Sequence, residues 1–282
     1  MEPANDIYDV ANDAKASFDE IYNRPDPRSY YRTLGALDYR IPTEAQPVFR
    51  KVMRSMGGQK LSVVDVGCSY GVNAAVIQYD LDFSDLVARY RSSVLRDESV
   101  AEAIFDDAAF FIDASKSVVA SFIGLDVAKE AVGYAKAVGL IDKSVTEDLE
   151  AAPLSPQAAA AVASADLVIT TGAVGYVTER TFSRIIDAVD GPPPWVAAFS
   201  LRQFPFDPIA EGLKGFGLAT EKLTDRTFPQ RRFRDEQEMA GAIAAVESLG
   251  LDPSGLEAEG EYFAEFYLAT PRGGPGLSDL RL

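Results

Sequence analysis

The fold is decided by the stretch Leu61-Ser62-Val63-Val64-Asp65-Val66-Gly67-Cys68-Ser69-Tyr70-Gly71-Val72-Asn73. Its first half is a short apolar run rich in valine, which is typical of a parallel strand buried on both faces. Gly67 and Gly71 follow, and a residue without a Cβ can take a positive φ and approach a ligand closely. A helix N-terminus after such a turn offers unpaired N–H groups to polar ligand atoms. The stretch therefore predicts a strand, a nucleotide-type binding loop and a helix.

Two familiar nucleotide loops fit this stretch poorly. A dinucleotide fingerprint requires glycines at relative positions one, three and six, and here those positions hold Gly67, Ser69 and Val72. A phosphate-binding P-loop requires Gly-Lys-Ser/Thr, and no such triplet follows. An NAD-dependent oxidoreductase is therefore a distant alternative. An ordinary strand-to-helix turn without a ligand also stays open.

The run resembles motif I of the class I S-adenosylmethionine-dependent methyltransferases, in which an acid stands two residues before a G-x-G-x-G loop. Asp65 is that acid, and Gly67, Ser69 and Gly71 occupy the loop positions. The serine departs from the pattern but is small enough to leave room for a ligand. The resemblance covers roughly residues 55–270. It implies a Rossmann-like three-layer α/β fold with a seven-stranded core, and S-adenosyl-L-methionine as the cofactor, with S-adenosyl-L-homocysteine as product.

Composition narrows the classes of partner. The chain has 27 basic and 43 acidic side chains and a formal net charge of −16, so a polyanion such as nucleic acid is an improbable ligand. The small cluster of Arg231, Arg232 and Arg234 does not reverse this, because clusters of this size are usually solvated or paired. Apolar runs are too short for a membrane span, and the first residues lack a signal-peptide core, so we expect a cytoplasmic protein. Cys68 is the single cysteine, which excludes an internal disulfide and a multi-cysteine metal site, so no metal is expected. Histidine is absent, which removes the most frequent general acid or base near neutral pH.

The chain divides into three expected parts. Residues 1–56 predict a helical N-terminal cap, with a leading helix before Pro25, an aromatic stretch around Tyr30 and Tyr31, and a helix from about 44 to 56. Residues 57–272 predict the main domain. Residues 273–282 predict a loose, flexible tail.

Strand-like and helix-like segments alternate through the main domain. After the first strand, the expected strands are 120–126, 143–146, 166–171, 195–200, 222–233 and 262–269. The gap of 55 positions between Gly71 and Asp126 is too long for one crossover, so a helical insertion is expected at about 80–115. Ser84 is its first predicted cap, and Ser99 with Glu102 predicts a capping box. We expect the N-terminal cap and this insertion to close over the ligand. The alternatives are a cap that packs over the core for stability alone and an insertion that is a surface elaboration.

Candidate ligand contacts follow the strands, because ligands of open α/β sheets bind beyond the carboxyl ends. Asp126 can accept two hydrogen bonds from vicinal ribose hydroxyls, and Val127 follows it. By resemblance, Asp148 would accept from the adenine amino group, and Leu149 would meet the ring edge. The expected cofactor set is Asp65, Gly67, Cys68, Ser69, Gly71, Asp126, Val127, Asp148, Leu149, Thr171 and Gly172. Helix caps or solvated acids are the alternatives for Asp126 and Asp148.

The expected acceptor is a small molecule methylated on oxygen. Without histidine, a carboxylate that is already ionised at pH 7 suits the chain slightly better than a phenol. Arg202 is the candidate cation and Tyr176 the candidate orienting hydroxyl, with Tyr30 and Tyr31 lining the acceptor side. A packing or surface role is the alternative for Arg202 and for Tyr176. Cys68 is expected to be small apolar filler rather than a nucleophile. A protein that binds the cofactor for non-methyl chemistry or as a scaffold is the alternative, and self-association is left open.

Overall fold

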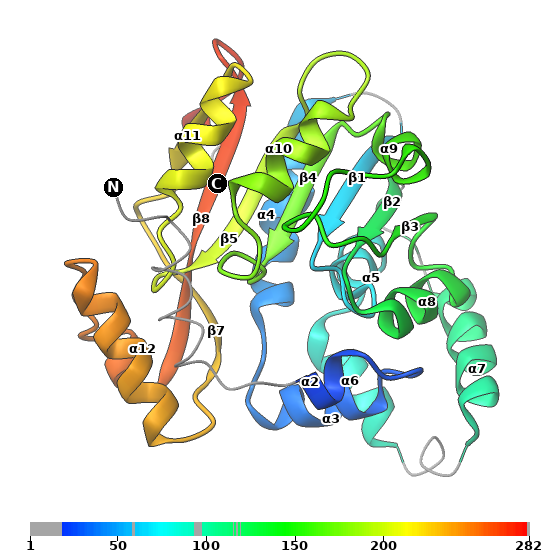
Figure 1. The fold of residues 1–282 in the computed structure, drawn as a ribbon. Coiled ribbons are helices and arrows are strands. Elements are labelled where there is room, and N and C mark those ends of the chain that lie inside the picture. The colour runs from blue at the N-terminus through cyan, green and yellow to red at the C-terminus, as the bar shows by residue number, and fades with distance from the viewer. Residues whose placement is uncertain are drawn as a thin grey trace.

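One open sheet runs through the computed structural model, which describes residues 19–57, 60–92, 98–114, 116, 118 and 120–280 (Figure 1). Its strands are β1 (Leu61–Val66), β2 (Ala120–Leu125), β3 (Lys143–Val145), β4 (Leu167–Thr171), β5 (Trp195–Leu201), β6 (Leu218–Lys222), β7 (Phe228–Arg232) and β8 (Glu261–Pro271). Their order is β3-β2-β1-β4-β5-β8-β6, and β7 pairs with β8. Most of the predicted leading helix lies outside the described residues.

The first five strands are parallel, and β8 is antiparallel to its neighbours. The strand β1 lies between β2 and β4, so the direction in which the sheet grows reverses beside β1. In open α/β sheets this reversal creates the crevice where ligands bind. Val63 and Val64 of β1 are fully buried, as expected for a strand covered on both faces.

Helices cover both faces of the sheet, as Figure 1 shows. Behind the sheet in this view are α4 (Ile41–Met56) and α5 (Val72–Gln78), and in front are α9 (Pro156–Val162), α10 (Glu179–Asp187) and α11 (Asp207–Gly215). In α10, Phe182, Ile185 and Ile186 form one buried stripe at helical spacing. The three-layer Rossmann-like prediction is confirmed. Further helices of the main domain include α8 (Lys129–Ala137), α12 (Glu236–Ser248) and the 3₁₀ turn η2 (Glu257–Glu259).

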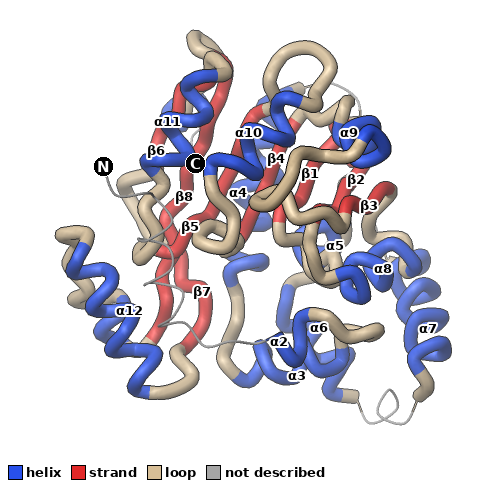
Figure 2. The backbone as a smooth tube through the Cα atoms, viewed as in Figure 1, coloured by secondary structure: helices blue, strands red, loops and turns tan. Residues whose placement is uncertain are grey.

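The segment 222–233 is not the single strand that its sequence predicts. Its first residue, Lys222, is the last residue of β6, and the segment contains the whole of a second strand, β7. These two strands pair with opposite ends of β8 (Figure 2). The eleven residues of β8 are enough for both partners. The described sheet therefore has eight strands rather than seven. The additional strand, β7, lies beside the N-terminal cap, because the N–H of Arg232 donates to the carbonyl of Leu37 at 2.8 Å.

The cap and the insertion form a group of helices below the carboxyl ends of the strands (Figure 1). The cap contributes α2 (Asp19–Tyr22) and α3 (Arg28–Ala36), and the insertion contributes α6 (Phe83–Arg91) and α7 (Val100–Asp113). The predicted capping box of Ser99 and Glu102 is confirmed. The cap of α6 is Asp82 rather than Ser84, because Asp82 accepts from the N–H of Asp85 and Asp85 accepts in return from Asp82.

A buried carboxylate holds the insertion in place. Asp107 on α7 accepts hydrogen bonds from the hydroxyls of Tyr90 at 2.8 Å and Tyr134 at 2.7 Å. It also pairs with Arg89. On the other side of Tyr90, the ring of Tyr31 is stacked at 4.6 Å between centroids. The insertion thus packs on the cap helix α3 and on α8.

The predicted tail carries more structure than expected. Residues 277–280 form the short helix α13 (Leu277–Leu280), and the N–H of Leu277 donates to a carboxylate oxygen of Glu221 at 2.9 Å. Leu280 is buried against the core. Burial of one apolar side chain and an anchored backbone explain why this segment does not project loosely from the domain.

Candidate functional site

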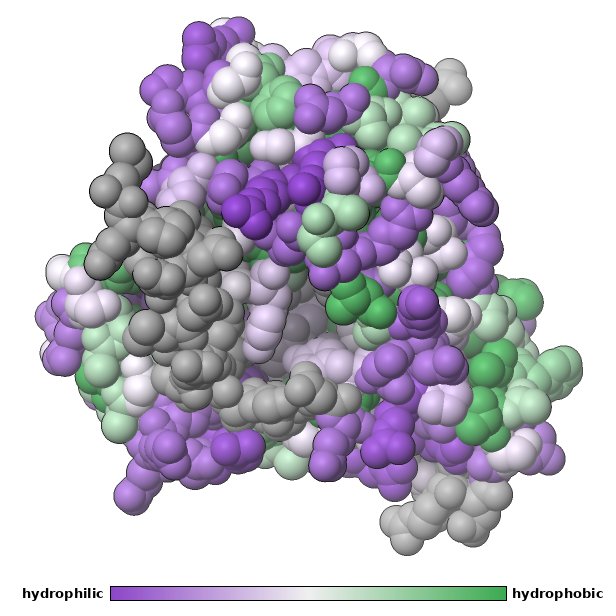
Figure 3. Space-filling view, viewed as in Figure 1, coloured by the Kyte–Doolittle hydropathy of each residue, from purple (hydrophilic) through white to green (hydrophobic). Residues whose placement is uncertain are grey.

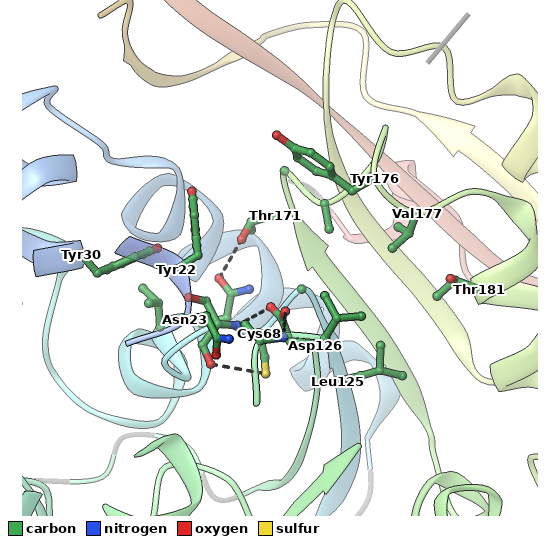
Figure 4. A pocket seen from close by; sticks show the side chains of 18 of the residues that line it. Tyr22, Asn23, Tyr30, Cys68, Leu125, Asp126, Thr171, Tyr176, Val177 and Thr181 are labelled. Atoms are coloured by element: carbon green, nitrogen blue, oxygen red, sulfur yellow. Dashed lines mark hydrogen bonds between the residues drawn. The ribbon is translucent and has the colours of Figure 1, made fainter. Parts of the chain in front are cut away.

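A cavity of about 680 Å³ opens at the carboxyl ends of β1, β2 and β4, next to the cap helices. Figure 3 shows this face of the molecule hollowed near its centre, and Figure 4 shows side chains entering the hollow from both sides. Several predicted residues share its lining: Tyr30, Gly67, Cys68, Ser69, Asp126, Val127, Asp148, Leu149, Thr171, Gly172 and Tyr176. The volume lies within the range of about 300–1,000 Å³ that small-molecule sites occupy.

The glycine loop is strongly curved where it meets the cavity. Gly67, Ser69 and Gly71 all have positive φ, of 72°, 47° and 76°. A Cβ on Gly67 would lie 2.7 Å from the Cβ of Ala173, so this position requires glycine twice over. The hydroxyl oxygen of Ser69 is buried and has no hydrogen-bond partner among the described residues. A buried, unpartnered hydroxyl at the edge of a cavity is available to a ligand atom.

Asp126, which follows β2, holds this loop. Its Oδ2 accepts from the backbone N–H of Ser69 at 2.9 Å, and its Oδ1 accepts from the N–H of Ala128 at 3.0 Å (Figure 4). An ionised carboxylate has about four acceptor sites, so two bonds leave capacity for a ligand. Asp126 is only partly buried and lines the cavity. It therefore has the position expected of a ligand-binding acid.

Asp65 and Gly71 do not line the cavity, which corrects the expectation that they face the ligand directly. Asp65 is fully buried beneath the loop, and its Oδ1 accepts from Asn73 Nδ2 at 2.9 Å. Asn73 Oδ1 in turn accepts from the hydroxyl of Thr171 at 3.1 Å, which does line the cavity. Burial raises the pKa of Asp65 to about 7, the hydrogen bond from Asn73 opposes this rise, and the charge of Asp126 adds to it.

The segment after β3 carries the predicted adenine contacts. Asp148 is exposed, and its Oδ1 accepts from the N–H groups of Glu150 and Ala151 at 2.9 and 3.2 Å. Leu149 is buried, and its carbonyl accepts from Arg184. This geometry gives Asp148 the local role of a turn-forming aspartate. Both hydrogen bonds are accepted by Oδ1, so the other carboxylate oxygen, Oδ2, is available to solvent or a ligand.

Two predicted acceptor residues lie elsewhere. Arg202 is 7% exposed and pairs with Glu257, and its guanidinium also donates to the carbonyl of Asp252 at 2.9 Å. Tyr31 is buried in the stack with Tyr90. Neither belongs to the lining of the cavity, so both predictions are corrected. The reason is tertiary, because partners far away in the sequence satisfy both side chains.

The prediction that the insertion closes over the cavity is also corrected. The described residues between 80 and 114 contribute nothing to the lining, whereas the cap contributes Tyr22, Asn23, Tyr30 and Tyr39. Phe83 and Tyr90 of the insertion pack on Tyr31 of α3 instead, and the hydroxyl of Tyr90 also bonds to that of Tyr134 on α8. The aromatic residues of the insertion therefore contribute to packing within the protein rather than to contact with a ligand.

Sequence reasoning missed several lining residues, above all Gln230 and Arg231 of β7. Arg231 is almost fully buried and makes a two-pronged ion pair with Glu238, at 3.0 and 2.6 Å. The arginine cluster was expected to be solvated or paired, and pairing is what the structure shows for Arg231. The sequence signal that could have identified these two lining residues was a glutamine next to an arginine inside a strand-like segment.

Charge and protonation in the cavity follow from burial. Burial raises the pKa of the tyrosines from the cap, to about 12 for Tyr39 and well above 10 for Tyr30, so these hydroxyls are neutral near pH 7. Burial likewise raises the pKa of the Cys68 thiol, which agrees with a filler role. Among the lining residues, the acids Asp126, Glu147, Asp148 and Glu150 outnumber the paired cation Arg231. The cavity thus favours a ligand with positive charge.

The fold and the site together define a Rossmann-like α/β protein with a cavity at its switch point. No protein-family model and no curated protein matches this sequence. Solved structures are similar at low identity. The plantazolicin methyltransferase BpumL, in complex with a monoazolic desmethyl-plantazolicin analogue and S-adenosylhomocysteine, is 10% identical, with 95% of this chain and 98% of that chain covered and a TM-score of 0.47.

Two further solved structures show the same kind of similarity. A TehB-like S-adenosylmethionine-dependent methyltransferase from Corynebacterium glutamicum is 14% identical, with 85% and 94% of the two chains covered and a TM-score of 0.42. An O-methyltransferase from a trans-AT polyketide synthase of Brevibacillus brevis is 12% identical, with 86% and 80% covered and a TM-score of 0.39. At such identities, the strand order and glycine loop of this chain are what define its fold. No helix in the described residues has the length and apolarity needed to cross a bilayer.

Proposed function

We propose that this chain binds S-adenosyl-L-methionine in the cavity and transfers its methyl group to a small molecule. The observation that carries this proposal is the hydrogen bond from the backbone N–H of Ser69 to the carboxylate of Asp126. It places an unpartnered hydroxyl, a curved glycine loop and a carboxylate at one edge of the cavity. Binding to the polar atoms of a nucleoside ligand explains this combination of groups better than a purely structural turn does.

The cofactor fits the charge of the site. When bound, S-adenosyl-L-methionine supplies an electrophilic methyl group on a positively charged sulfonium. The acidic lining stabilises such a cation, because Asp126 and Glu147, Asp148 and Glu150 contribute negative charge around the cavity. In the proposed arrangement, Asp126 accepts from the ribose hydroxyls and Asp148 from the adenine amino group. Thr171 and Gly172 border the side of the methyl group.

The chain contributes positioning rather than proton transfer at the acceptor side. Tyr22, Tyr30 and Tyr39 enter there from the cap and Tyr176 enters from the loop after β4, as Figure 4 shows for the labelled ones. Burial keeps the cap hydroxyls protonated, so they can donate hydrogen bonds but are poor bases. Holding an acceptor in line with the methyl group supplies much of the rate enhancement in such displacements.

The kind of acceptor follows from the same groups. An acceptor that is already nucleophilic needs no base, so O-methylation of a carboxylate is preferred over that of a phenol. The preference rests on ionisation alone, since Arg202 is elsewhere and Arg231 is already paired with Glu238. The second candidate function is a protein that binds the same cofactor without methyl transfer, which the unpaired loop hydroxyl of Ser69 would serve equally well.

Titration calorimetry and product analysis separate these functions. The purified protein is titrated with S-adenosylmethionine, S-adenosylhomocysteine and NAD, and binding of the first two alone is expected. Incubation with S-adenosylmethionine and a panel of carboxylic acids, phenols and amines is then followed by mass spectrometry. A gain of one methyl group on a carboxylic acid supports the full proposal. Binding without any methylated product supports the second candidate, and binding of NAD alone refutes both.

A further inference from the structure

The strand β7 is irregular where it passes the cavity. Pro229 pairs with Phe263 and Arg231 pairs with Tyr262, so Gln230 is one residue more than β8 can match. An extra residue of this kind is a β-bulge. Bulges are frequent beside functional sites, where they turn a side chain to a new direction. Here the bulged residue is Gln230, and its side chain lines the cavity.

The backbone around the bulge is held by the N-terminal cap. The carbonyl of Gln230 accepts from the N–H of Arg40 at 2.8 Å, and the N–H of Arg232 donates to the carbonyl of Leu37 at 2.8 Å. The same connection between α3 and α4 carries Tyr39, another lining residue. The direction of the Gln230 side chain is therefore fixed from both sides of β7.

The side-chain amide of Gln230 is left with an unsatisfied oxygen. Gln230 is 3% exposed, and its Oε1 is buried without a hydrogen-bond partner among the described residues. A buried acceptor without a donor costs free energy, so such groups are rare in structures and call for an explanation. A ligand that brings an N–H or O–H group to this oxygen removes the cost.

The end of β4 leaves room for this amide. A Cβ on Gly172 would lie 2.6 Å from Nε2 of Gln230, and Gly172 has a φ of 81°. Only glycine combines that backbone conformation with that space. Gln230 consequently reaches the side of the cavity where Thr171 and Gly172 are proposed to border the methyl group. The amide lies beside Gly172, where an acceptor would be held.

The surroundings of the amide indicate the chemistry of that acceptor. Tyr22, Tyr39 and Tyr176 line the same cavity, so the walls around the acceptor are aromatic. The neighbouring charge of Arg231 is compensated by Glu238. Stacking on aromatic walls and one neutral hydrogen bond suit a flat ring system that carries a neutral N–H or O–H donor in addition to the methylated group.

We propose that Gln230 is the specificity-determining residue for the methyl acceptor. It recognises an aromatic molecule through an N–H or O–H donor, separate from the methylated atom, that binds its side-chain oxygen. This inference rests on the proposed function, because it places the acceptor beside a bound methyl donor. It adds a residue and a ligand chemistry that the glycine loop and the acids do not define.

Indole and 1-methylindole test the inference, because they share an aromatic body and differ in the N–H donor. Their dissociation constants are measured by ligand-observed NMR on the full chain saturated with S-adenosylhomocysteine. Indole should bind about five-fold more tightly, the effect of one neutral hydrogen bond. In Gln230→Met, which keeps the length of the side chain without its polar atoms, the ratio should fall to about one. The affinity for S-adenosylhomocysteine should not change.

Thermal stability separates recognition from a structural role. Because Gln230→Met removes an unsatisfied buried oxygen, its Tm should equal or exceed that of the wild type, whereas a structural amide would lose stability. Gln203→Met serves as the matched control. Gln203 is also buried but lies outside the cavity lining, and its replacement should leave the five-fold ratio intact.

The outcomes against the inference are distinct from failure of the proposed function. Equal binding of the two indoles by the wild type, binding of neither, or a five-fold ratio that survives in Gln230→Met overturns the assignment of Gln230. Failure of the wild type to bind S-adenosylhomocysteine would instead refute the proposed function, and it is measured separately by calorimetry.

Discussion

The backbone N–H of Ser69 donates a 2.9 Å hydrogen bond to Oδ2 of Asp126, which stands 57 positions later in the chain. The acid that follows β2 therefore fixes the glycine loop that follows β1. Ser69 has a φ of 47°, a conformation that a residue with a side chain adopts at a cost. The bond to Asp126 compensates for that cost, so the loop and the acid act as one unit.

Replacing Asp126 should weaken cofactor binding. Asp126→Ala removes the proposed acceptor of the ribose hydroxyls and the anchor of Ser69, so the affinity for S-adenosylmethionine and S-adenosylhomocysteine should fall by about 1.5–3 kcal/mol. That corresponds to roughly 10- to 150-fold in the dissociation constant. Isothermal titration calorimetry measures both ligands directly.

A second aspartate provides the control for this loss. Asp166 accepts from the backbone N–H of Ser62 at 2.8 Å, at the opposite end of β1 from the cavity. Asp166→Ala removes a bond of the same kind and should leave both affinities unchanged. If Asp126→Ala binds as tightly as the wild type, the proposed place of the ribose is incorrect.

Protonation of Asp65 should make stability depend on pH. Burial raises the pKa of Asp65 to about 7, well above its value in the unfolded chain, so the folded state holds the proton more tightly. Between about pH 4 and pH 7 the folded protein thus binds more protons than the unfolded one, and the free energy of unfolding decreases as the pH rises. Asp65→Asn can still accept from Asn73 and does not titrate.

Urea denaturation of both proteins at pH 5, 6, 7 and 8 tests this sign. The stability of Asp65→Asn relative to the wild type should increase from pH 5 to pH 7 and then change little further, because the wild-type carboxyl is ionised only once the pH passes about 7 in the folded state. Parallel stability curves across this range would show that Asp65 has an ordinary pKa. The difference between the two proteins cancels the titration of the other acids.

The insertion should matter for stability and not for the ligand. Asp107→Ala leaves Arg89 and the hydroxyls of Tyr90 and Tyr134 without their shared acceptor, at a cost of about 3 kcal/mol in the free energy of unfolding. The affinity for S-adenosylhomocysteine should stay within two-fold. Asp106→Ala, one residue earlier and exposed, should change stability by less than about 0.5 kcal/mol. Loss of ligand affinity in Asp107→Ala without loss of stability would restore the insertion as part of the site.

Arg202 should also prove structural. Arg202→Ala leaves the buried carboxylate of Glu257 without its partner and should destabilise the protein by about 3–5 kcal/mol, with cofactor affinity unchanged. The double variant Arg202→Met, Glu257→Leu should recover much of that loss, because it removes both charges together. Urea denaturation measures stability in each protein, and calorimetry measures affinity. Selective loss of acceptor methylation in Arg202→Ala at full stability would contradict this assignment.

The sequence by itself determined the local features of this protein. A valine-rich run before Gly67 and Gly71 predicted a strand, a loop and a helix, and acids after later strands predicted Asp126 and Asp148 at the same edge of the sheet. These predictions succeed because strand burial, helix capping and the need for glycine at positive φ depend on a few neighbouring residues. The capping box of Ser99 and Glu102 was predictable for the same reason.

Only the tertiary structure decided which side chains reach the cavity. Arg202 looked available until Glu257, which is 55 positions away, proved to be its partner. Gln230 looked like an ordinary strand residue until the pairing of β7 with β8 left it unmatched. Such outcomes depend on which distant segments meet, and on whether a buried polar group finds its partner within the protein. Local sequence patterns do not show which distant segments come into contact, so the acceptor side of the site could be identified only in the folded chain.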